Sequence, residues 1–186
     1  MKRLFLIAGL TTAFVLAAVA VGAGSAANFG GTWVMDKTKS QGLDPRMQNA
    51  ESVSCVIVQD DKTLSIEWKV VAGQPPAGAP PSGGGGGMGG GRAPAGPRVY
   101  NLDGKEVTSD AGGQMGGTNT VKATWSSDGK TLELSTVRTG SRDGQEFKIT
   151  TIDKLSLSED GKVMTVNRHS ESPMGTRDST FVFNKQ

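Results

Sequence analysis

The chain has 186 residues, with 20 Lys and Arg against 18 Asp and Glu, and 35% of its residues are hydrophobic. Because the charges nearly balance and no long basic run occurs, the sequence lacks the positive surface that nucleic acid requires, and no nucleic-acid partner is expected. The single cysteine, Cys55, excludes an intramolecular disulfide and a Cys-rich zinc site.

The first 27 residues have the three parts of a signal peptide. A basic start at 1–3 precedes an apolar stretch over 4–21, and Ser25 and Ala27 place small residues at a cleavage site. An uncleaved membrane anchor is the alternative, because the apolar stretch is just long enough to span a bilayer. We expect cleavage after residue 27, which leaves equal numbers of positive and negative charges, no membrane span, and a periplasmic or secreted protein.

The mature chain is expected to consist almost entirely of β-strands. Residues 30–36 and 178–185 are predicted to form the first and last strands. The main helix signal lies at 44–48, where Asp44 is a suitable N-cap and Pro45 occupies the first helical position.

Between these ends a short turn occurs four times: Asp-Asp-Lys at 60–62, and Asp-Gly-Lys at 103–105, 128–130 and 160–162. Asp-Gly supplies the positive φ of tight hairpins, so each copy is expected to join two antiparallel strands. Apolar residues alternate on both sides of each turn, which is typical of strands with one face toward a core. The side chains predicted to be buried are Trp33, Ile57, Leu64, Trp68, Tyr100, Trp125, Leu132, Leu157 and Phe181.

Residues 72–98 interrupt this pattern with a stretch rich in Gly that holds most of the eight prolines. Such a composition cannot bury enough apolar area to offset the entropy of ordering, so a flexible loop is predicted. The part of the mature chain before the loop is too short to fold alone. Residues 28–186 are therefore expected to form one domain that this loop interrupts.

About ten sequential antiparallel strands around one core predict an all-β, up-and-down barrel of eight to ten strands, because closure removes exposed edges; a two-sheet sandwich is the alternative. In this order the four Asp turns lie at one end. The remaining connections lie at the opposite end, at 37–50, 72–97, 109–117, 139–144 and 171–177. Functional residues gather on long loops held by a rigid scaffold, so the long-loop end is the expected mouth of a binding site.

The string Asn28-Phe29-Gly30-Gly31-Thr32-Trp33 resembles the N-terminal motif of lipocalins, and its F-x-G-T-W part is similar to the start of fatty-acid-binding proteins. The resemblance implies the calycin group of ligand-binding β-barrels, in which this Trp packs across the closed end. The T-D-Y motif of typical lipocalins is missing, as is, near Arg177, the R-x-Y that holds the ligand carboxylate in fatty-acid-binding proteins. The chain looks most like exported bacterial lipocalin-like proteins, and the resemblance does not identify a ligand.

No catalytic constellation accompanies the only histidine, His169, so no enzyme activity is expected. Cys55 falls on the predicted inward face, where a free thiol behaves as a small hydrophobe. Met88, Met115 and Met174 each precede a Gly in a loop of the mouth end, and their soft thioethers suit Cu(I). Methionines in Gly-rich loops are more often incidental, so no metal or other cofactor is predicted.

The alternation also places charged residues inside the barrel toward the long-loop end: Arg98, Arg138, Arg168 and Asp153. Charges inside a barrel must pair with one another, reach water at the rim, or meet a charged ligand, and Asp153 can neutralise one arginine. In the functional interpretation, arginines hold the anionic head of a ligand whose apolar part lies deeper. The predicted ligand-binding residues are Arg138, Arg168, Arg98, Trp68, Leu134 and Val166.

Two functions follow from these patterns. The first is an exported, non-enzymatic, lipocalin-like protein that binds a small apolar or amphipathic ligand, anionic ones included, inside the barrel. The second is a solid barrel that serves as an interaction or structural module of the cell envelope, with the Gly/Pro-rich loop contacting a partner. Interior volume separates them, because Trp33, Trp68 and Trp125 all point inward in the predicted register and are large enough to fill a small barrel.

Overall fold

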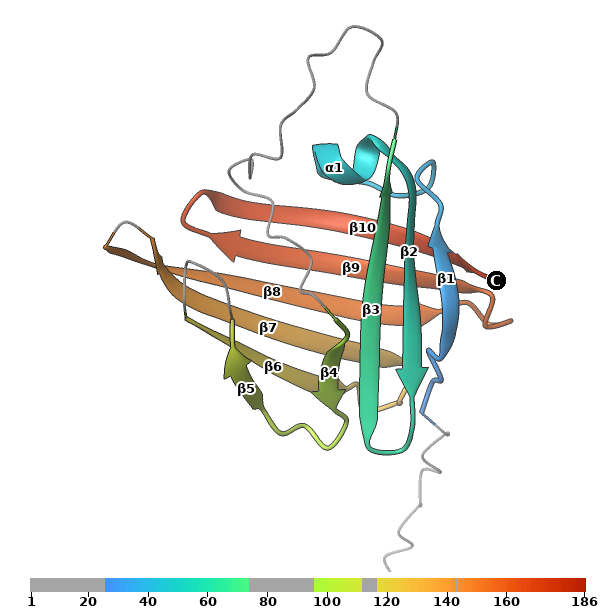
Figure 1. The fold of residues 1–186 in the computed structure, drawn as a ribbon. Helices are drawn as coiled ribbons and strands as arrows, with labels where there is room; N and C mark the ends of the chain where they lie inside the picture. Colours follow the sequence, from blue (N-terminus) through green and yellow to red (C-terminus); the bar gives the residue numbers. More distant parts are fainter. Residues whose placement is uncertain (1–25, 74–95, 112–116, 143) are drawn as a thin grey trace, which may run out of the picture.

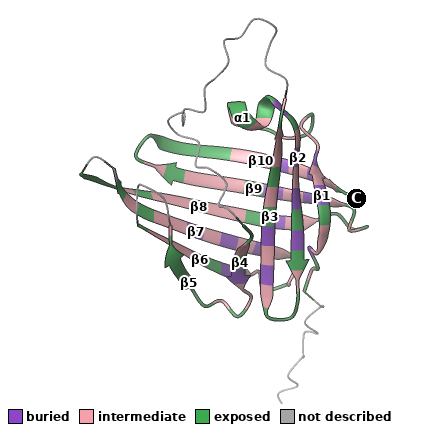
Figure 2. Ribbon diagram, viewed as in Figure 1, coloured by how far each residue is buried: buried purple, intermediate pink, exposed green. Residues whose placement is uncertain are grey.

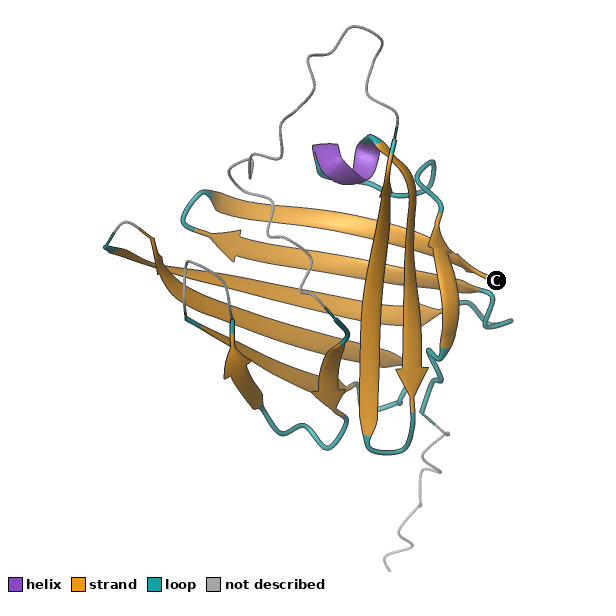
Figure 3. Cartoon of the chain, in the orientation of Figure 1, coloured by secondary structure: helices purple, strands orange, loops and turns teal. Residues whose placement is uncertain are grey.

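The computed structural model describes residues 26–73, 96–111, 117–142 and 144–186. These residues form ten strands and one short helix (Figures 1 and 3). The elements in chain order are β1 (Gly31–Met35), α1 (Pro45–Gln48), β2 (Ala50–Gln59), β3 (Thr63–Ala72), β4 (Arg98–Asn101), β5 (Val107–Asp110), β6 (Thr118–Trp125), β7 (Thr131–Arg142), β8 (Gln145–Leu157), β9 (Val163–Ser172) and β10 (Gly175–Lys185). Residues 1–25 of the predicted signal peptide and residues 74–95 of the Gly/Pro-rich loop lie outside the described residues.

All ten strands belong to one antiparallel sheet, in the order β4-β3-β2-β1-β10-β9-β8-β7-β6-β5. Because β1 pairs with β10, the sheet curls round into a nearly closed up-and-down barrel, which confirms the predicted fold class. Figure 1 shows β2 and β3 running crosswise in front of β7–β10, so that the two halves of the sheet enclose the core between them. The strands on either side of residues 74–95, β3 and β4, pair with each other.

The opening in the sheet lies between β4 and β5 and corrects one expectation. The turn at 103–105 was expected to join two paired strands, but in the described part of the chain β4 pairs with β3 and β5 pairs with β6. The chain leaving β4 stays tied to the β3 side, because the Leu102 amide donates to the Lys62 carbonyl at 2.8 Å. Side chains span the opening instead: the Tyr100 hydroxyl lies 3.2 Å from Oγ1 of Thr136 on β7.

The core fills the half of the barrel nearest the Asp turns. Figure 2 shows buried segments on β2 and β3 toward the turn that joins them. Trp33 is fully buried there, and its indole N–H donates to the Phe29 carbonyl at 2.8 Å. Each such apolar side chain contributes roughly 1.5–3 kcal/mol by leaving water. Burial is confirmed for Trp33, Ile57, Leu64, Tyr100, Leu132 and Phe181, whereas Trp68, Trp125 and Leu157 are half-buried and pack against the core.

Helix α1 begins where the sequence predicted. The Asp44 side chain accepts a hydrogen bond from the Met47 amide at 2.8 Å, which satisfies a backbone donor of the first turn. The helix lies at the long-loop end beside β2 (Figure 1), and the neighbouring Leu43 is buried. No helix among the described residues is long and apolar enough to cross a membrane.

Two connections at the long-loop end are shorter than expected. The segment 139–144 was expected to be a loop, but β7 continues to Arg142 and β8 begins at Gln145; similarly, only two residues separate β9 from β10 within 171–177. Gly144 (φ 79°) and Gly175 (φ 115°) adopt the positive φ that permits such tight reversals. The long-loop end therefore carries two long hairpins, β7–β8 and β9–β10, which project to the left in Figure 1.

Candidate functional site

The burial of inward-facing side chains decreases along the barrel from the Asp turns to the long-loop end. On β7, Leu132, Leu134 and Thr136 are 0%, 1% and 9% exposed. Arg138, the next residue on the same face, is half-buried. On β3 and β9, buried Ile66 and Val166 are likewise followed by half-buried Trp68 and Arg168. Solvent therefore reaches the barrel interior at the long-loop end, while the other end is solid.

We call this solvent-reached part of the interior the mouth. Its inward position follows from strand alternation, because each member lies an even number of residues from a buried core residue on its own strand. The half-buried mouth residues used below are Trp68 on β3, Arg98 on β4, Arg138 on β7, Phe147, Ile149 and Asp153 on β8, and Arg168 on β9, and buried Thr136 on β7 borders them.

Arg168 and Asp153 form a two-point ion pair at the base of the mouth. Arg168 Nε and Nη2 donate to the two carboxylate oxygens of Asp153 at 2.7 and 2.8 Å, and the two side chains are 25% and 14% exposed. The guanidinium also lies 5.0 Å from the ring centre of Phe181 and 6.0 Å from that of Trp68. Burial by itself would lower the pKa of Arg168. The hydrogen bond and charge of Asp153 raise the pKa by more, so it lies above its ordinary value. The Asp153 charge thus neutralises Arg168. Pairing of Asp153 with one arginine was one of the alternatives that the sequence left open.

The other two mouth arginines lie on either side of Thr136. Arg98 Nη1 donates to the Thr136 hydroxyl at 3.4 Å, at the limit of a hydrogen bond. Arg138 lies two residues beyond Thr136 on the same face, with its guanidinium 6.0 Å from the ring centre of Phe147. Arg138 Nε is buried and has no hydrogen-bond partner among the described residues. Neither arginine forms an ion pair with a described carboxylate, so within the described residues the charge of both is unpaired.

All six predicted site residues lie inside the barrel, but at two depths. Trp68, Arg98 and Arg138 line the mouth, and Arg168 lies at its base in the ion pair with Asp153. Leu134 and Val166 are buried in the packed layer beneath. Their role in ligand binding stays a prediction.

Sequence reasoning missed Thr136 and Phe147 as mouth residues. Thr136 falls between Leu134 and Arg138 in the alternation on β7, so the register already placed it inward; its role depends on Arg98 and Tyr100, which arrive from a distant strand. Phe147 belongs to the inward alternation that the sequence predicted for β8, but it was not among the predicted ligand-binding residues. Its place in the mouth depends on its contact with Arg138 of the neighbouring strand β7.

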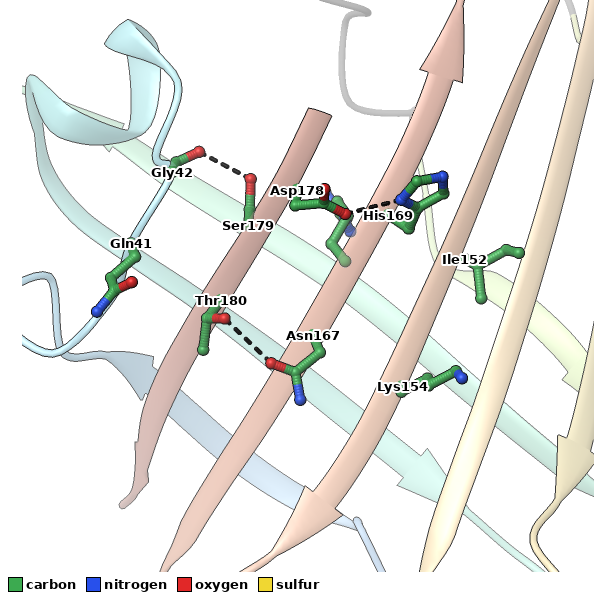
Figure 4. A pocket seen from close by; sticks show the side chains of 10 residues that line it. Gln41, Gly42, Ile152, Lys154, Asn167, His169, Asp178, Ser179 and Thr180 are labelled. Atoms are coloured by element: carbon green, nitrogen blue, oxygen red, sulfur yellow. Dashed lines mark hydrogen bonds and ion pairs between the residues drawn. The ribbon is translucent and has the colours of Figure 1, made fainter. Parts of the chain in front are cut away.

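A hollow of about 500 Å³ lies on the outer face of the barrel (Figure 4). Most of its side chains come from outward positions of β8, β9 and β10, and several of them are already hydrogen-bonded. His169 Nδ1 lies 2.7 Å from Asp178 and its Nε2 3.3 Å from Glu171, and Thr180 donates to Asn167 at 3.0 Å. Because this pocket is open to solvent and its described polar groups are largely satisfied, it can bury little of a ligand, and the mouth is the stronger candidate site.

Two further residues singled out in the sequence do not contribute a reactive group to the mouth. Burial raises the pKa of the Cys55 thiol to about 12, so the thiol stays protonated and unreactive at neutral pH. Met174 is 86% exposed in the turn between β9 and β10. Met88 and Met115 lie outside the described residues.

The fold and the site together define an antiparallel up-and-down β-barrel that is solid at one end and open, with arginines, at the other; this architecture fits the calycin-type fold that the resemblance implied. The chain matches no protein-family model and no curated protein sequence. Among solved structures, it is similar to the zebrafish ileal bile acid-binding protein in complex with cholic acid, with 14% sequence identity and a TM-score of 0.46 over 85% of this chain and 98% of that chain.

Proposed function

We propose that this protein is a non-enzymatic binder of a small apolar or amphipathic molecule, which it holds inside the barrel at the mouth. The observation that carries the proposal is the burial gradient: inward-facing Trp68, Arg138 and Arg168 remain partly exposed while the residues beneath them are buried. Side chains that face inward and still meet solvent can contact a molecule that enters from the long-loop end.

The composition of the mouth suits an amphipathic occupant. Trp68, Phe147 and Ile149 offer apolar surface, while Thr136 and the arginines supply a few polar groups on one side. Small-molecule sites in proteins combine a largely apolar lining with a small number of polar groups that fix orientation. The ion pair of Arg168 with Asp153 limits how deep such a molecule can reach.

Binding without catalysis is supported by the state of the two most reactive side chains. Both ring nitrogens of His169 lie within hydrogen-bonding distance of carboxylates, on the outer face and away from the mouth. Cys55 is buried and protonated. A nucleophile needs an adjacent base and access to substrate, and neither side chain has both.

Tryptophan fluorescence tests the proposal directly, because Trp68 lies in the mouth whereas Trp33 is fully buried. Titration with a panel of fatty acids, aromatic anions and their neutral analogues should give saturable quenching with at least one compound. Trp68→Phe should remove most of this signal. The matched variant Trp125→Phe should retain it, because Trp125 stacks on Phe29 near an Asp turn.

Absence of saturable binding across the panel, confirmed by calorimetry, would contradict the proposal. That result would favour the alternative of a solid barrel that acts as an interaction module of the cell envelope. The Gly/Pro-rich loop that would contact the partner lies mostly outside the described residues.

We also propose that the protein is exported, to the periplasm or beyond, on the strength of the signal-peptide pattern over residues 1–27. Expression of the full chain in a bacterial host, followed by fractionation and N-terminal sequencing, tests this. The expected product starts at Asn28 and leaves the cytoplasm. A cytoplasmic protein that keeps Met1 would contradict export.

A further inference from the structure

We infer that the ligand is a compact anion: a carboxylate on an apolar body about the size of two fused rings, with its head at Arg138. The inference rests on the proposed function and specifies the ligand class for the same site. It draws on two independent observations. The first is the position of the floor, by which we mean the packed layer of Leu134 and the Arg168–Asp153 pair, and the second is the unequal environments of the mouth arginines.

The floor limits the size of the ligand. Leu134, Asp153 and Arg168 stand side by side in the β7–β8–β9 register, so the ion pair lies level with the last fully buried residue of β7. Arg138 lies four residues farther along β7, roughly 13 Å at 3.3 Å per residue. A molecule whose head reaches Arg138 therefore meets the packed layer within this distance, so only a short apolar body fits above the layer and a long chain would have to extend into solvent.

The arginines determine the charge of the ligand. Both carboxylate oxygens of Asp153 are taken up by Arg168, which leaves Arg168 little capacity for a second anion. Arg138 is the opposite case, since its buried Nε lacks a partner among the described residues. A buried donor without a partner is costly, and a carboxylate that accepts from Nε and an adjacent Nη would satisfy it in the two-point geometry that Arg favours. Arg98, on the other side of Thr136, adds positive charge to the same side of the mouth.

Calorimetric titration with 2-naphthoate and 2-naphthamide tests the inference, because these probes share shape and differ in charge. Wild-type protein should bind 2-naphthoate at least tenfold more tightly than 2-naphthamide. Arg138→Met should weaken 2-naphthoate binding by about 10- to 100-fold, the loss expected for hydrogen bonds to a charged group, and leave 2-naphthamide unchanged. The matched control Lys148→Met removes one positive charge from an exposed residue of β8 and should retain the preference.

The unfolding free energy of Arg138→Met separates binding from a role in the fold. Since Arg138 has an unsatisfied donor, the variant should be at least as stable as the wild type. A marked loss of stability, or a preference for 2-naphthoate that survives in Arg138→Met, would overturn the assignment. Equal affinity of the wild type for the two probes would overturn the inference and leave the proposed function standing. No binding of either probe or of any compound in the fluorescence panel would instead refute the proposed function.

Discussion

Identical side chains on the inner face of this barrel have different capacities because their neighbours differ. Arg168 has two parallel hydrogen bonds to Asp153 and two aromatic rings beside it, so its charge is balanced within the protein. Arg138 has one aromatic neighbour and a buried nitrogen with no described partner. The positive charge of Arg168 is thus largely neutralised by Asp153, whereas the charge of Arg138 has no described counter-ion and could pair with a ligand.

The ion pair between Arg168 and Asp153 should stabilise the fold measurably. We expect Asp153→Asn and Arg168→Met each to lower the unfolding free energy by about 2 kcal/mol, because each leaves a partly buried polar partner unsatisfied. The double variant should lose less than the sum of the two, which a double-mutant cycle by urea denaturation measures.

A matched control for that cycle is available on the surface. Lys154 and Glu133 form an exposed pair at 3.6 Å, and their coupling should fall below about 1 kcal/mol. Coupling between Arg168 and Asp153 no larger than that of the surface pair would show that the base of the mouth is not held by its charges.

Glycines at strand ends shape the mouth and the closed end, but under different steric conditions. Gly117, which precedes β6 at the long-loop end, has φ +94°, and a Cβ built on it would clash with the Thr139 carbonyl oxygen of β7. Gly161, in the turn between β8 and β9, has φ +67° with open space around it. A residue with a Cβ would meet both an unfavourable positive φ and a clash at position 117. At position 161 it would meet the unfavourable φ alone.

Substitution to alanine should separate these two effects. Gly161→Ala should cost about 1–2 kcal/mol, the cost of a left-handed backbone for a residue with a Cβ. Gly117→Ala should cost clearly more and disturb the β6–β7 pairing, because strand backbone must move to admit the methyl group. Thermal denaturation of both variants measures the difference in stability. Equal losses of stability would mean that the backbone of β6 and β7 moves at little cost to admit the methyl group.

His169 connects β9 to β10 and should make their pairing sensitive to pH. The His169 ring donates hydrogen bonds to the carboxylates of Asp178 and, with smaller effect, Glu171, and these bonds raise the pKa of His169 above its ordinary value of 6.5. Because the pKa is higher in the folded state, the stabilisation is complete below about pH 6.5, while both carboxylates remain ionised, and is lost as pH rises through the folded-state pKa.

His169→Gln should therefore remove a decline of stability that the wild type shows as pH rises above 6.5 through the folded-state pKa. Since the chain has a single histidine, NMR titration of its ring protons gives the folded-state pKa without ambiguity. A value at or below 6.5 would contradict the proposed link between the strands.

For the molecule as a whole, alternation counted outward from the Asp turns was enough to predict the strand number, the barrel and the inward register of Arg98, Arg138 and Arg168. That reasoning works because a strand with one buried face repeats every two residues, so a turn of known position determines which residues face inward. It failed for the turn at 103–105 and for the lengths of the two long hairpins. The opening at 103–105 depends on contacts between segments distant in sequence, such as Tyr100 with Thr136, which local pattern does not contain. The hairpin lengths depend on how far the strand pairing continues, to Arg142 with Gln145 and to Ser172 with Gly175.

The same limit applied to the site. The register placed three arginines and one aspartate in the interior, but it did not show which arginine Asp153 would pair with. That choice depends on the alignment of β8 with β9, where Asp153 stands directly opposite Arg168. That Arg138 Nε has no partner among the described residues is likewise a property of the assembled barrel.

The central claim, that a ligand lies inside the barrel and not on its outer surface, is tested most directly by intermolecular NOEs in protein with labelled isoleucine methyl groups. Ile149 and Ile152 lie three residues apart on β8 and point to opposite faces, the first into the mouth and the second into the outer pocket. With 2-naphthoate, or with the best compound from the fluorescence panel, we predict NOEs to Ile149 and none to Ile152. NOEs to Ile152 without any to Ile149 would place the ligand on the outer face and contradict the account.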